Sequence, residues 1–523
     1  MKKLSIGTHT FEKLRNDNFI YVDKTGHIYN LINNGSVYFL SRPRRFGKSL
    51  LISTLEELFK ANKDLFEGLY IWDKWDWSKK NPVIRLDFTE IGYKNSEELE
   101  KSFNVFLDNT AKRNNVEITK DAPISVKFAE LIEQLHKKTE QRVVILIDEY
   151  DKPLIDNLLN KEIYSEVKRS LHNFYQVIKA GDKHIQFVLL TGVSQFSGLS
   201  IFSGLNNLNN ITLDSRYSSI CGYTQEELES SFKEYIESTS KEMGLREEEL
   251  LSKIKYWYNG YSWDGKVFVY NPFSTLKCCD SKEFIGHWFE TGTPTFLIEE
   301  IRKKDNLEIC IERRKVGIGS LKGEGRESID TTALLFQTGY MTIKEKKIIE
   351  DEPEYVIDFP NNEVERAFIS SLMKEYTLRS AEEVNEVNKK IKERMRAKDA
   401  KGLEESLKEL FANIPYDLHT KRESYYHSLF LLAAKMSGYE VEGEVHTDKG
   451  RIDVVIKGKE SVVVVEIKYA KGKGAVVEKK IKEAMKQIRE TKYYEKYKTN
   501  KVSLLAIAFG EKKEIRCRFE GVS

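Results

Sequence analysis

The sequence has few of the features that mark secreted or membrane proteins. Its 523 residues include only five cysteines and no Cys-x-x-Cys pair, which excludes a disulfide framework and a zinc finger. No apolar run reaches the roughly 18 residues that a membrane helix needs. The basic N-terminus lacks the apolar core of a signal peptide. We therefore expect a cytoplasmic protein without a membrane partner.

A large excess of charge of one sign is also absent. The formal net charge is +2, which does not by itself indicate nucleic-acid binding. The distribution is uneven, because residues 441–523 carry a net charge of +7 and the remaining 440 residues a net charge of −5. A basic C-terminal module is typical of a polyanion site. A solvated, lysine-rich surface would have the same composition.

One short stretch has the plan of a phosphate-binding loop. Residues 34–49 run NGSVYFLSRPRRFGKS, a strand pattern followed by a basic turn, and a helical pattern begins at residue 50. In such a loop Gly47 and the backbone N–H groups hold phosphate oxygens. Lys48 reaches the β- and γ-phosphates, and Ser49 ligates Mg²⁺. The stretch therefore predicts a site for ATP and Mg²⁺.

Position 42 departs from the motif G-x-x-x-x-G-K-S, which has glycine there. A side chain on Arg42 crowds a place where the backbone approaches phosphate. The guanidinium groups of Arg42, Arg44 and Arg45 offer compensating contacts to phosphate oxygens, and Phe46 completes the predicted binding segment. The sequence thus predicts ATP binding and leaves turnover open.

Apolar strands and amphipathic helices alternate in the first 215 residues. Strands are predicted at residues 82–88, 142–151 and 184–192, and a helix at residues 161–180. Continuous apolarity predicts strands that are buried on both faces, as in a parallel sheet. The alternation predicts a doubly wound α/β fold, the P-loop NTPase class.

Three polar residues end the predicted strands. Asp148, Glu149 and Thr191 fall at carboxyl ends, where parallel sheets bind their ligands. Asp148 is placed to hold Mg²⁺ through water, and Glu149 to polarise the attacking water. Thr191 is placed to sense the γ-phosphate. The structural alternative is an exposed strand end beside a surface turn.

The strand pattern fades after about residue 224. We expect residues 216–375 to form a mostly helical lid or middle domain, with a helical stretch from Asn271 through residue 296. Residues 376–417, dense in Glu, Lys and Arg, predict a solvated helical connector. Aromatic residues at 257–263 are candidates for base stacking, with a small hydrophobic core as the alternative. Tyr21 and its neighbours are candidates to pack near adenine, with structural packing as the alternative.

The last segment, residues 418–523, again mixes strands and helices. A helix is predicted at residues 422–437, and a hairpin of strands 439–446 and 451–456 follows, joined by a turn at 448–450. A third strand, a helix and a last strand come next, at residues 461–468, 477–497 and 501–508. This pattern predicts a small α/β domain.

Two carboxylates and a lysine lie on the second and third of these strands. Asp453 and Glu466 can converge on one Mg²⁺, for which Mn²⁺ can substitute. Lys468 shares a strand face with Glu466 and would orient and help to deprotonate the attacking water. Glu423 and Gln487, on the flanking helices, are further candidates for contacts to water, metal or phosphate. A salt-bridged strand end is the structural alternative.

Several phrases in the chain resemble one family. These are residues 19–25, 41–49, 146–151, 191–194 and 202–207. They look like the bacterial and archaeal AAA-ATPase-like family, in which a PD-(D/E)XK nuclease domain of restriction-endonuclease-like fold follows the ATPase domain. Asp453 and Glu466-Ile-Lys468 resemble that nuclease motif. In this family arginine also replaces the first loop glycine.

The resemblance implies ATP binding in the first part and Mg²⁺-dependent phosphodiester cleavage in the last. The expected partner is nucleic acid, with DNA favoured over RNA, and a homo-oligomer is a further option. Defence against or processing of foreign DNA follows from the architecture alone. The alternative is a nucleotide-gated nucleic-acid-binding protein, or a signalling or scaffold ATPase, whose nuclease fold is inactive.

Overall fold

The chain forms two compact units in the computed structural model, and each is described by itself. The first unit comprises Met1–Thr291 and Arg314–Glu363, and the second Gly292–Arg313 and Val364–Ser523. The structure describes residues 1–158, 160–195, 207–288, 297–299, 301, 313–323, 330–413, 423–447, 450–458, 461–497 and 501–522. In this part of the chain no helix is both long and apolar enough to cross a membrane.

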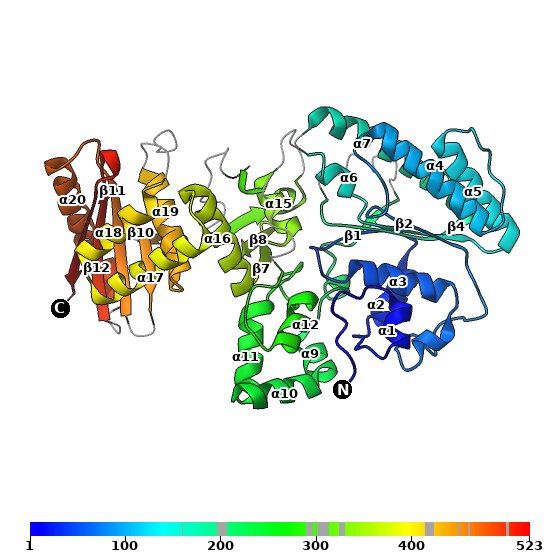
Figure 1. Ribbon diagram of the computed structural model, residues 1–523, viewed down its shortest axis with the longest axis horizontal. Coiled ribbons are helices and arrows are strands. Elements are labelled where there is room, and N and C mark those ends of the chain that lie inside the picture. Colours follow the sequence, from blue (N-terminus) through cyan, green and yellow to red (C-terminus); the bar gives the residue numbers. More distant parts are fainter. Residues whose placement is uncertain are drawn as a thin grey trace. The chain divides into compact units, whose positions relative to one another are not determined.

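The first unit opens with an α/β domain around a parallel sheet (Figure 1). Its strands are β1 (Val37–Ser41), β2 (Val83–Asp87), β3 (Val143–Asp148), β4 (Ile185–Gly192) and β5 (Asn209–Asn210). Its helices are α1 (Phe11–Asn16), α2 (Thr25–Asn34), α3 (Lys48–Phe59), η1 (Lys63–Phe66), α4 (Ser96–Arg113), α5 (Ile124–Thr139), α6 (Lys152–Ile155), α7 (Lys161–Ala180), η2 (Asp182–His184) and η3 (Ser215–Tyr217). The predicted strands and the helix at residues 161–180 are confirmed.

The strand order places three predicted site residues at one edge. The order is β2-β3-β4-β1-β5, and all pairings are parallel. The strand that ends in Thr191-Gly192 therefore lies between the strand that leads into the phosphate loop and the strand that ends in Asp148. Because parallel strands end on the same side, these groups come together at the carboxyl edge of the sheet.

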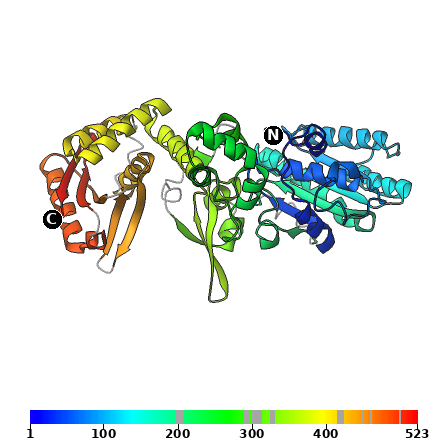
Figure 2. The same cartoon turned by 90° about the horizontal axis from the view of Figure 1, so that it is seen from below.

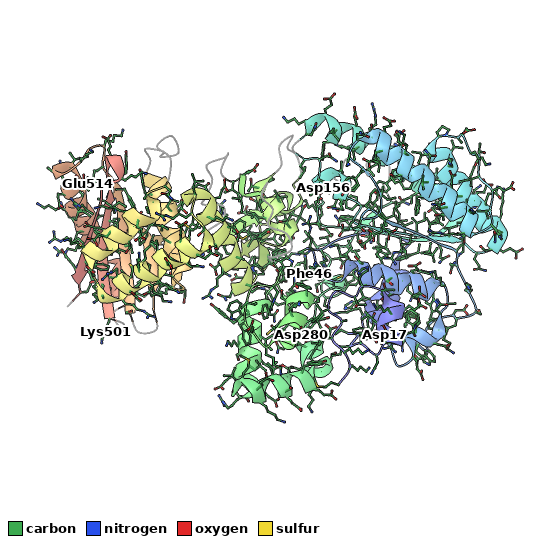
Figure 3. The ribbon with its side chains drawn as sticks, in the orientation of Figure 1. Asp17, Phe46, Asp156, Asp280, Lys501 and Glu514 are labelled. Carbon is green, nitrogen blue, oxygen red and sulfur yellow. The ribbon has the colours of Figure 1, made fainter. Side chains whose placement is uncertain are left out.

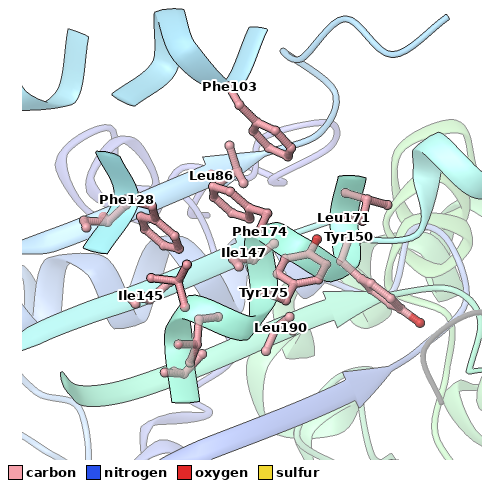
Figure 4. Packing of buried hydrophobic residues seen from close by; sticks show 14 of the residues in the cluster. Leu86, Phe103, Phe128, Ile145, Ile147, Tyr150, Leu171, Phe174, Tyr175 and Leu190 are labelled. Atoms are coloured by element: carbon pink, nitrogen blue, oxygen red, sulfur yellow. The ribbon is translucent and has the colours of Figure 1, made fainter. Parts of the chain in front are cut away.

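Helices cover both faces of this sheet. In Figure 1, α4, α5 and α7 lie on one face, and α1, α2 and α3 on the other. Every residue of β3 is buried, as its continuous apolar run predicts. On the first face Phe174 stacks between Phe103 and Phe128, with ring centroids 4.3 and 4.4 Å apart (Figure 4). This aromatic core fixes the helices on the sheet.

The middle part of the first unit begins with helices, the element type that the sequence predicts for this region. They are α9 (Gln225–Ser231), α10 (Lys233–Met243), α11 (Glu247–Tyr258) and α12 (Pro272–Ser281). Thr224 caps α9 in a capping box with Glu227. The expected helical stretch through residue 296 is too long, because α12 ends at Ser281, where Lys282 takes φ +56°. Residues 289–296 lie outside the described part.

A three-stranded antiparallel sheet in the same part was not predicted. Its order is β6-β8-β7, from β6 (Arg314–Gly317), β7 (Thr342–Ile349) and β8 (Glu352–Asp358), with α14 (Ile318–Lys322) and α15 (Thr331–Thr338) beside them in sequence. The β7–β8 hairpin projects as a pair of yellow-green strands in Figure 2. Four consecutive charged residues, Lys344 to Lys347, form the middle of β7, so it lacks the apolar alternation by which strands are recognised.

The second unit is built on a five-stranded sheet of order β13-β12-β11-β10-β9. Its helices are α16 (Asn362–Thr377), which starts in the first unit, α17 (Ala381–Ala397), α18 (Ala400–Phe411), α19 (Glu423–Met436), α20 (Ala475–Thr491), η7 (Tyr493–Tyr497) and η8 (Glu511–Lys513). Its strands are β9 (Glu440–Thr447), β10 (Gly450–Lys457), β11 (Ser461–Tyr469), β12 (Lys501–Phe509) and β13 (Ile515–Gly521). The predicted hairpin and central strands are confirmed, and β13 was missed.

The two faces of this sheet carry different helices. Even-numbered residues of β11 and β12, such as Val464 and Leu504, pack against α20. Odd-numbered residues at the strand ends pack against α19, where Tyr426 stacks on Tyr469 and Phe509. Side chains alternate along a strand, so Glu466 and Lys468 belong to the α20 face.

The predicted connector helices exist, but they are not simply solvated. Leu403, Leu407 and Leu410 of α18 are fully buried. Glu404 accepts a hydrogen bond from the Cys517 backbone N–H of β13 at 2.8 Å. The apolar stripe is hidden in the sequence by a dense charge pattern on the opposite face of the helices. These helices therefore belong to the C-terminal unit.

Candidate functional site

The phosphate loop joins β1 to α3. Gly47 takes φ +92°, a left-handed conformation that favours glycine, and it is the N-cap of α3. Lys48 folds back over its own loop, where Nζ donates to the carbonyls of Arg42 and Pro43 at 3.0 Å each. Ser49 follows in the first turn of α3, with a half-buried side chain. The loop and helix terminus thus present the donors that phosphate binding needs.

Asp148 and Thr191 meet at the ends of adjacent strands. Thr191 Oγ1 donates to Asp148 Oδ1 at 2.5 Å, and the Glu149 backbone N–H donates to the same oxygen at 3.1 Å. Asp148 is fully buried, and its Oδ2 has no hydrogen-bond partner among the described residues. A buried carboxylate oxygen without a partner is costly. Its chemistry fits a hydrated Mg²⁺ ion.

Glu149 occupies a strained position next to this pair. Its φ is +51°, a conformation uncommon for residues other than glycine. Burial raises the pKa of Glu149, the Lys48 ammonium opposes that shift, and the nearby carboxylates of Asp148 and Asp151 add to it. A carboxylate with a raised pKa is better matched to proton transfer near neutral pH. Such a strained, shifted residue is typical of functional sites.

The side chain of Arg42 does not point toward phosphate, which corrects the expected contact. Its guanidinium is fully buried. Nη1 donates to the carbonyls of Ser41 at 2.8 Å and Thr212 at 3.0 Å, and Nη2 donates to that of Tyr217 at 3.0 Å. The crowding expected at this position is thus avoided, because the side chain leaves the interior of the loop.

The other loop residues differ in their environment. Arg44 and Arg45 are exposed, and the Arg45 guanidinium lies 4.7 Å from the centroid of the Phe273 ring. Phe46, labelled in Figure 3, is buried edge-on against Tyr261 and Trp263. The aromatic residues at 257–263 therefore contribute to a hydrophobic core, and Tyr261 and Trp263 are not available for base stacking.

A pocket opens beside Gly47, with an empty volume of about 510 Å³, part of it open to solvent. Its lining combines the N-terminal segment, the start of α3 and the entry to the middle part: Ser5, Ile20, Tyr21, Val22, Lys24, Phe46, Gly47, Leu50, Leu51, Thr54, Ile220, Cys221, Gly222, Tyr223 and Pro272. Lys24 pairs with Glu227 at 2.6 Å. Tyr21, expected near adenine, thus lies on the wall of a mostly apolar pocket.

Sequence reasoning missed Asp151, which anchors the loop after β4. Asp151 is fully buried, and its Oδ2 accepts hydrogen bonds from the Ser194 backbone N–H and hydroxyl, both at 2.6 Å. The Val193 N–H donates to both carboxylate oxygens, at 3.2 and 3.1 Å. The acidic cluster Asp148-Glu-Tyr-Asp151 was the available signal. It did not reveal which acid faces the neighbouring loop.

Asp453, Glu466 and Lys468 come together in the second unit. They lie just beyond the Val454–Val465 pair of the β10–β11 register. Asp453 Oδ2 accepts the Ile467 backbone N–H at 2.7 Å, and Lys468 Nζ donates to Glu466 Oε1 at 2.8 Å. The Asp453 carboxylate thus lies against the backbone between Glu466 and Lys468. Glu466 is almost fully buried, whereas Lys468 remains partly open to solvent.

Gln487 and Glu423, the two flanking candidates, lie on the helices α20 and α19. Gln487 is half-buried on α20, the helix on the face of Glu466 and Lys468. Glu423 begins α19, and its side chain lies outside the described part of the chain. His427 of α19 is buried and contacts the Asp453 carbonyl at 2.8 Å.

Asp453 and Glu466 are the candidate metal ligands among the described side chains of this site. Within the described ranges, no group of three His, Cys, Asp or Glu side chains converges to hold a metal. Asp453 and Glu466 supply the hard oxygen donors that suit Mg²⁺, with a backbone carbonyl and water as the expected remaining ligands. The donor set therefore fits a hard divalent cation and does not fit a structural zinc ion.

Comparisons with known proteins agree with both halves of the chain. Residues 5–202 match the family described as predicted AAA-ATPase, and residues 421–519 match the PD-(D/E)XK nuclease superfamily. An uncharacterized protein in the vnfD 5′ region of Azotobacter chroococcum mcd 1 is 38% identical over 516 residues, covering 97% of this chain and 96% of that protein.

A solved structure also aligns with a large part of the chain. The Aeropyrum pernix ORC2 protein (ADPNP-ADP complexes) is 10% identical, and the alignment covers 68% of this chain and 95% of that one. Its TM-score of 0.31 is too low to bear on fold or function. The family assignment rests on the two family matches and on the near full-length relative. The chain belongs to the AAA-ATPase-like family that carries a C-terminal PD-(D/E)XK nuclease-superfamily domain.

Proposed function

We propose that the chain binds and hydrolyses ATP in its first unit and that this nucleotide state regulates a Mg²⁺-dependent nuclease in its second. The observation that carries the nuclease proposal is the hydrogen bond from the Ile467 N–H to Asp453, which holds this carboxylate between Glu466 and Lys468. Paired carboxylates with an adjacent lysine supply what phosphodiester hydrolysis requires: a metal site and a charged group beside the attacking water.

In the nucleotide site, we assign each residue a role from its position. Lys48 and the backbone N–H groups at Gly47 would hold the phosphates. Ser49 and Asp148 would hold the metal ion, which when bound neutralises charge on the phosphate oxygens. Glu149 would accept a proton from the attacking water, and Thr191 would respond to the terminal phosphate. The apolar pocket at Tyr21 and Tyr223 is proposed to take the base.

In the nuclease site, Asp453 and Glu466 would hold Mg²⁺ or Mn²⁺, which when bound supplies Lewis-acid activation of the phosphate. Lys468 would exchange its contact with Glu466 for one with the attacking water or a phosphate oxygen. Gln487 and Glu423 are proposed to assist from the flanking helices. The excess of positive charge in residues 441–523 favours a polyanionic substrate, and DNA is the substrate that we propose.

The test is a cleavage panel with single- and double-stranded DNA and RNA, each with and without ATP and Mg²⁺. Asp453→Asn should abolish cleavage and leave ATP binding intact, and Lys48→Met should weaken ATP binding measured by calorimetry. Lys60→Met is the matched control for Lys48, because Lys60 lies at the opposite, C-terminal end of the same helix and pairs there with Glu56, away from the loop. Equal cleavage by wild type and Asp453→Asn would refute the nuclease half.

A second candidate function is a nucleotide-gated binding or scaffold protein with an inactive nuclease fold. It would bind DNA without cutting it in every metal tested, and Mn²⁺ would not bind at Asp453 and Glu466. A cytoplasmic setting, assembly into a homo-oligomer and a role in defence against or processing of foreign DNA complete the proposal. The role rests on the architecture alone.

A further inference from the structure

The phosphate loop is held from outside by an aromatic pair. Tyr261 and Trp263 lie between α11 and α12 in sequence and are both buried. At one end of the loop, the Arg42 guanidinium carbon lies 3.8 Å from the centroid of the Trp263 ring. At the other end, the Phe46 ring lies edge-on to Tyr261 at 4.7 Å and to Trp263 at 5.6 Å. Both ends of the loop therefore rest on Trp263, and the Phe46 end also rests on Tyr261.

Arg42 also ties the loop to the segments on either side of β1. Its backbone N–H donates to the Gly192 carbonyl at 3.1 Å, which extends the pairing of β1 with β4. Its side chain reaches across to the Thr212 and Tyr217 carbonyls, and the Ser41 N–H donates to Thr212 Oγ1 at 3.0 Å. One residue thus joins the loop to the strand of Thr191 and to residues 212–217.

The partners of this guanidinium are carbonyl oxygens and a ring face. Burial lowers the pKa of Arg42 to about 10, so the group remains a charged donor at neutral pH. Its Nε makes no hydrogen bond within the described part of the chain. Burying a charge in this way is expensive unless the surroundings compensate for the loss of water. Three carbonyl dipoles and cation–π contact supply that compensation.

We propose that Arg42 is a positioning residue for the nucleotide site. Its guanidinium holds the phosphate loop in its binding shape by joining the loop to residues 212–217 and to Trp263. It thereby supplies, through contacts, what the glycine of the usual motif supplies through backbone freedom. The inference rests on the proposed ATP binding. It also explains why Lys48 can seat on the Arg42 and Pro43 carbonyls: the side chain of Arg42 has left the loop interior.

The direct test restores the motif. Arg42→Gly recreates G-x-x-x-x-G-K-S, yet we expect it to weaken ATP binding by at least about tenfold, the size of one lost charge-assisted interaction. Arg42→Lys should recover little, because an ammonium lacks the planar fork that matches three carbonyls and a ring. Arg216→Ala is the control, since Arg216 is an exposed arginine of the same neighbouring segment, paired with Asp214.

Chemical rescue separates positioning from a general loss of folding. Millimolar guanidinium should restore ATP affinity to Arg42→Gly, while urea at the same concentration should not, because urea is planar but uncharged. Trp263→Phe keeps an aromatic face and should bind ATP better than Trp263→Leu. These two variants preserve the test if Arg42→Gly fails to fold.

The outcomes are distinct. Wild-type affinity in Arg42→Gly, or equal affinities in Trp263→Leu and Trp263→Phe, would overturn the inference. Equal effects of guanidinium and urea on Arg42→Gly would overturn it as well. If the unaltered protein fails to bind ATP, the proposed function itself falls. If the unaltered protein binds and the glycine variant binds equally well, only the role of Arg42 falls.

Discussion

The two candidate sites are assembled in different ways. The nucleotide site takes Lys48, Asp148 and Thr191 from the ends of three parallel strands or the loops that follow them. The nuclease site takes Asp453, Glu466 and Lys468 from two strands that pair directly as antiparallel neighbours. The first site depends on the strand order of a whole sheet, whereas the second depends on one local register.

The resting contacts differ accordingly. Lys48 is bonded to two carbonyls of its own loop, so phosphate binding must draw this side chain away from them. In the nuclease site, Lys468 is bonded to Glu466, its neighbour on the same strand. We therefore expect nucleotide binding to reorient the Lys48 side chain over a loop that keeps its shape, and metal binding to leave the strand backbone in place. Each prediction below tests one side of this contrast.

The largest expected effect is on stability, and it tests whether the unit that carries the nuclease site unfolds independently of the nucleotide site. Leu407→Ala empties a fully buried position on α18, and a buried Leu→Ala change costs about 2–5 kcal/mol of unfolding free energy. In urea unfolding, the transition of the C-terminal unit should move to lower urea. The transition that ATP shifts upward should stay in place. Glu405→Ala, on an exposed position of the same helix, is the control.

The next largest effect is on cleavage at the nuclease site, which depends on the local register of β10 and β11. Glu466→Gln removes one of two predicted metal-binding carboxylates, and cleavage should fall roughly 10²–10³-fold, the usual loss for one preorganised electrostatic group. Glu442→Gln is the matched control, a strand carboxylate that pairs with Lys457, and it should cut at the wild-type rate. Equal losses in the two variants would mean that Glu466 acts through sheet stability alone.

The smallest effect probes the contact between β3 and β4. Thr191→Val keeps the shape of the side chain but removes the donor to Asp148. The buried Asp148 Oδ1 then keeps the hydrogen bond from the Glu149 N–H, and the loss of the Thr191 bond to this carboxylate should cost about 1–3 kcal/mol of unfolding free energy. ATP turnover should fall more than ATP affinity, and Thr191→Ser should restore both. A Thr191→Val protein with normal turnover would show that the hydrogen bond from Thr191 to Asp148 does not contribute to hydrolysis.

Local patterns predicted many individual elements well. The helix at residues 161–180 is amphipathic and capped by Asn160, and it has the predicted bounds. The Glu466-x-Lys468 spacing placed both side chains on one strand face, since side chains repeat every second residue. Hydrophobic periodicity did not reveal β7, because charged residues interrupt its apolar pattern. In α18, charged residues concealed an apolar stripe that packs on β13.

The phosphate loop, the acids that end its partner strand and the carboxylate–lysine group could be predicted from the sequence, because each depends on residue types at short, regular spacing. The orientation of these residues depends on the tertiary structure. It turned Arg42 outward onto Trp263 and three carbonyls, and it selected Asp151 to anchor the loop after β4. The physical reason is that a buried polar group takes the partners that neighbouring segments offer. Those neighbours are fixed by strand order and packing, which short-range patterns do not specify.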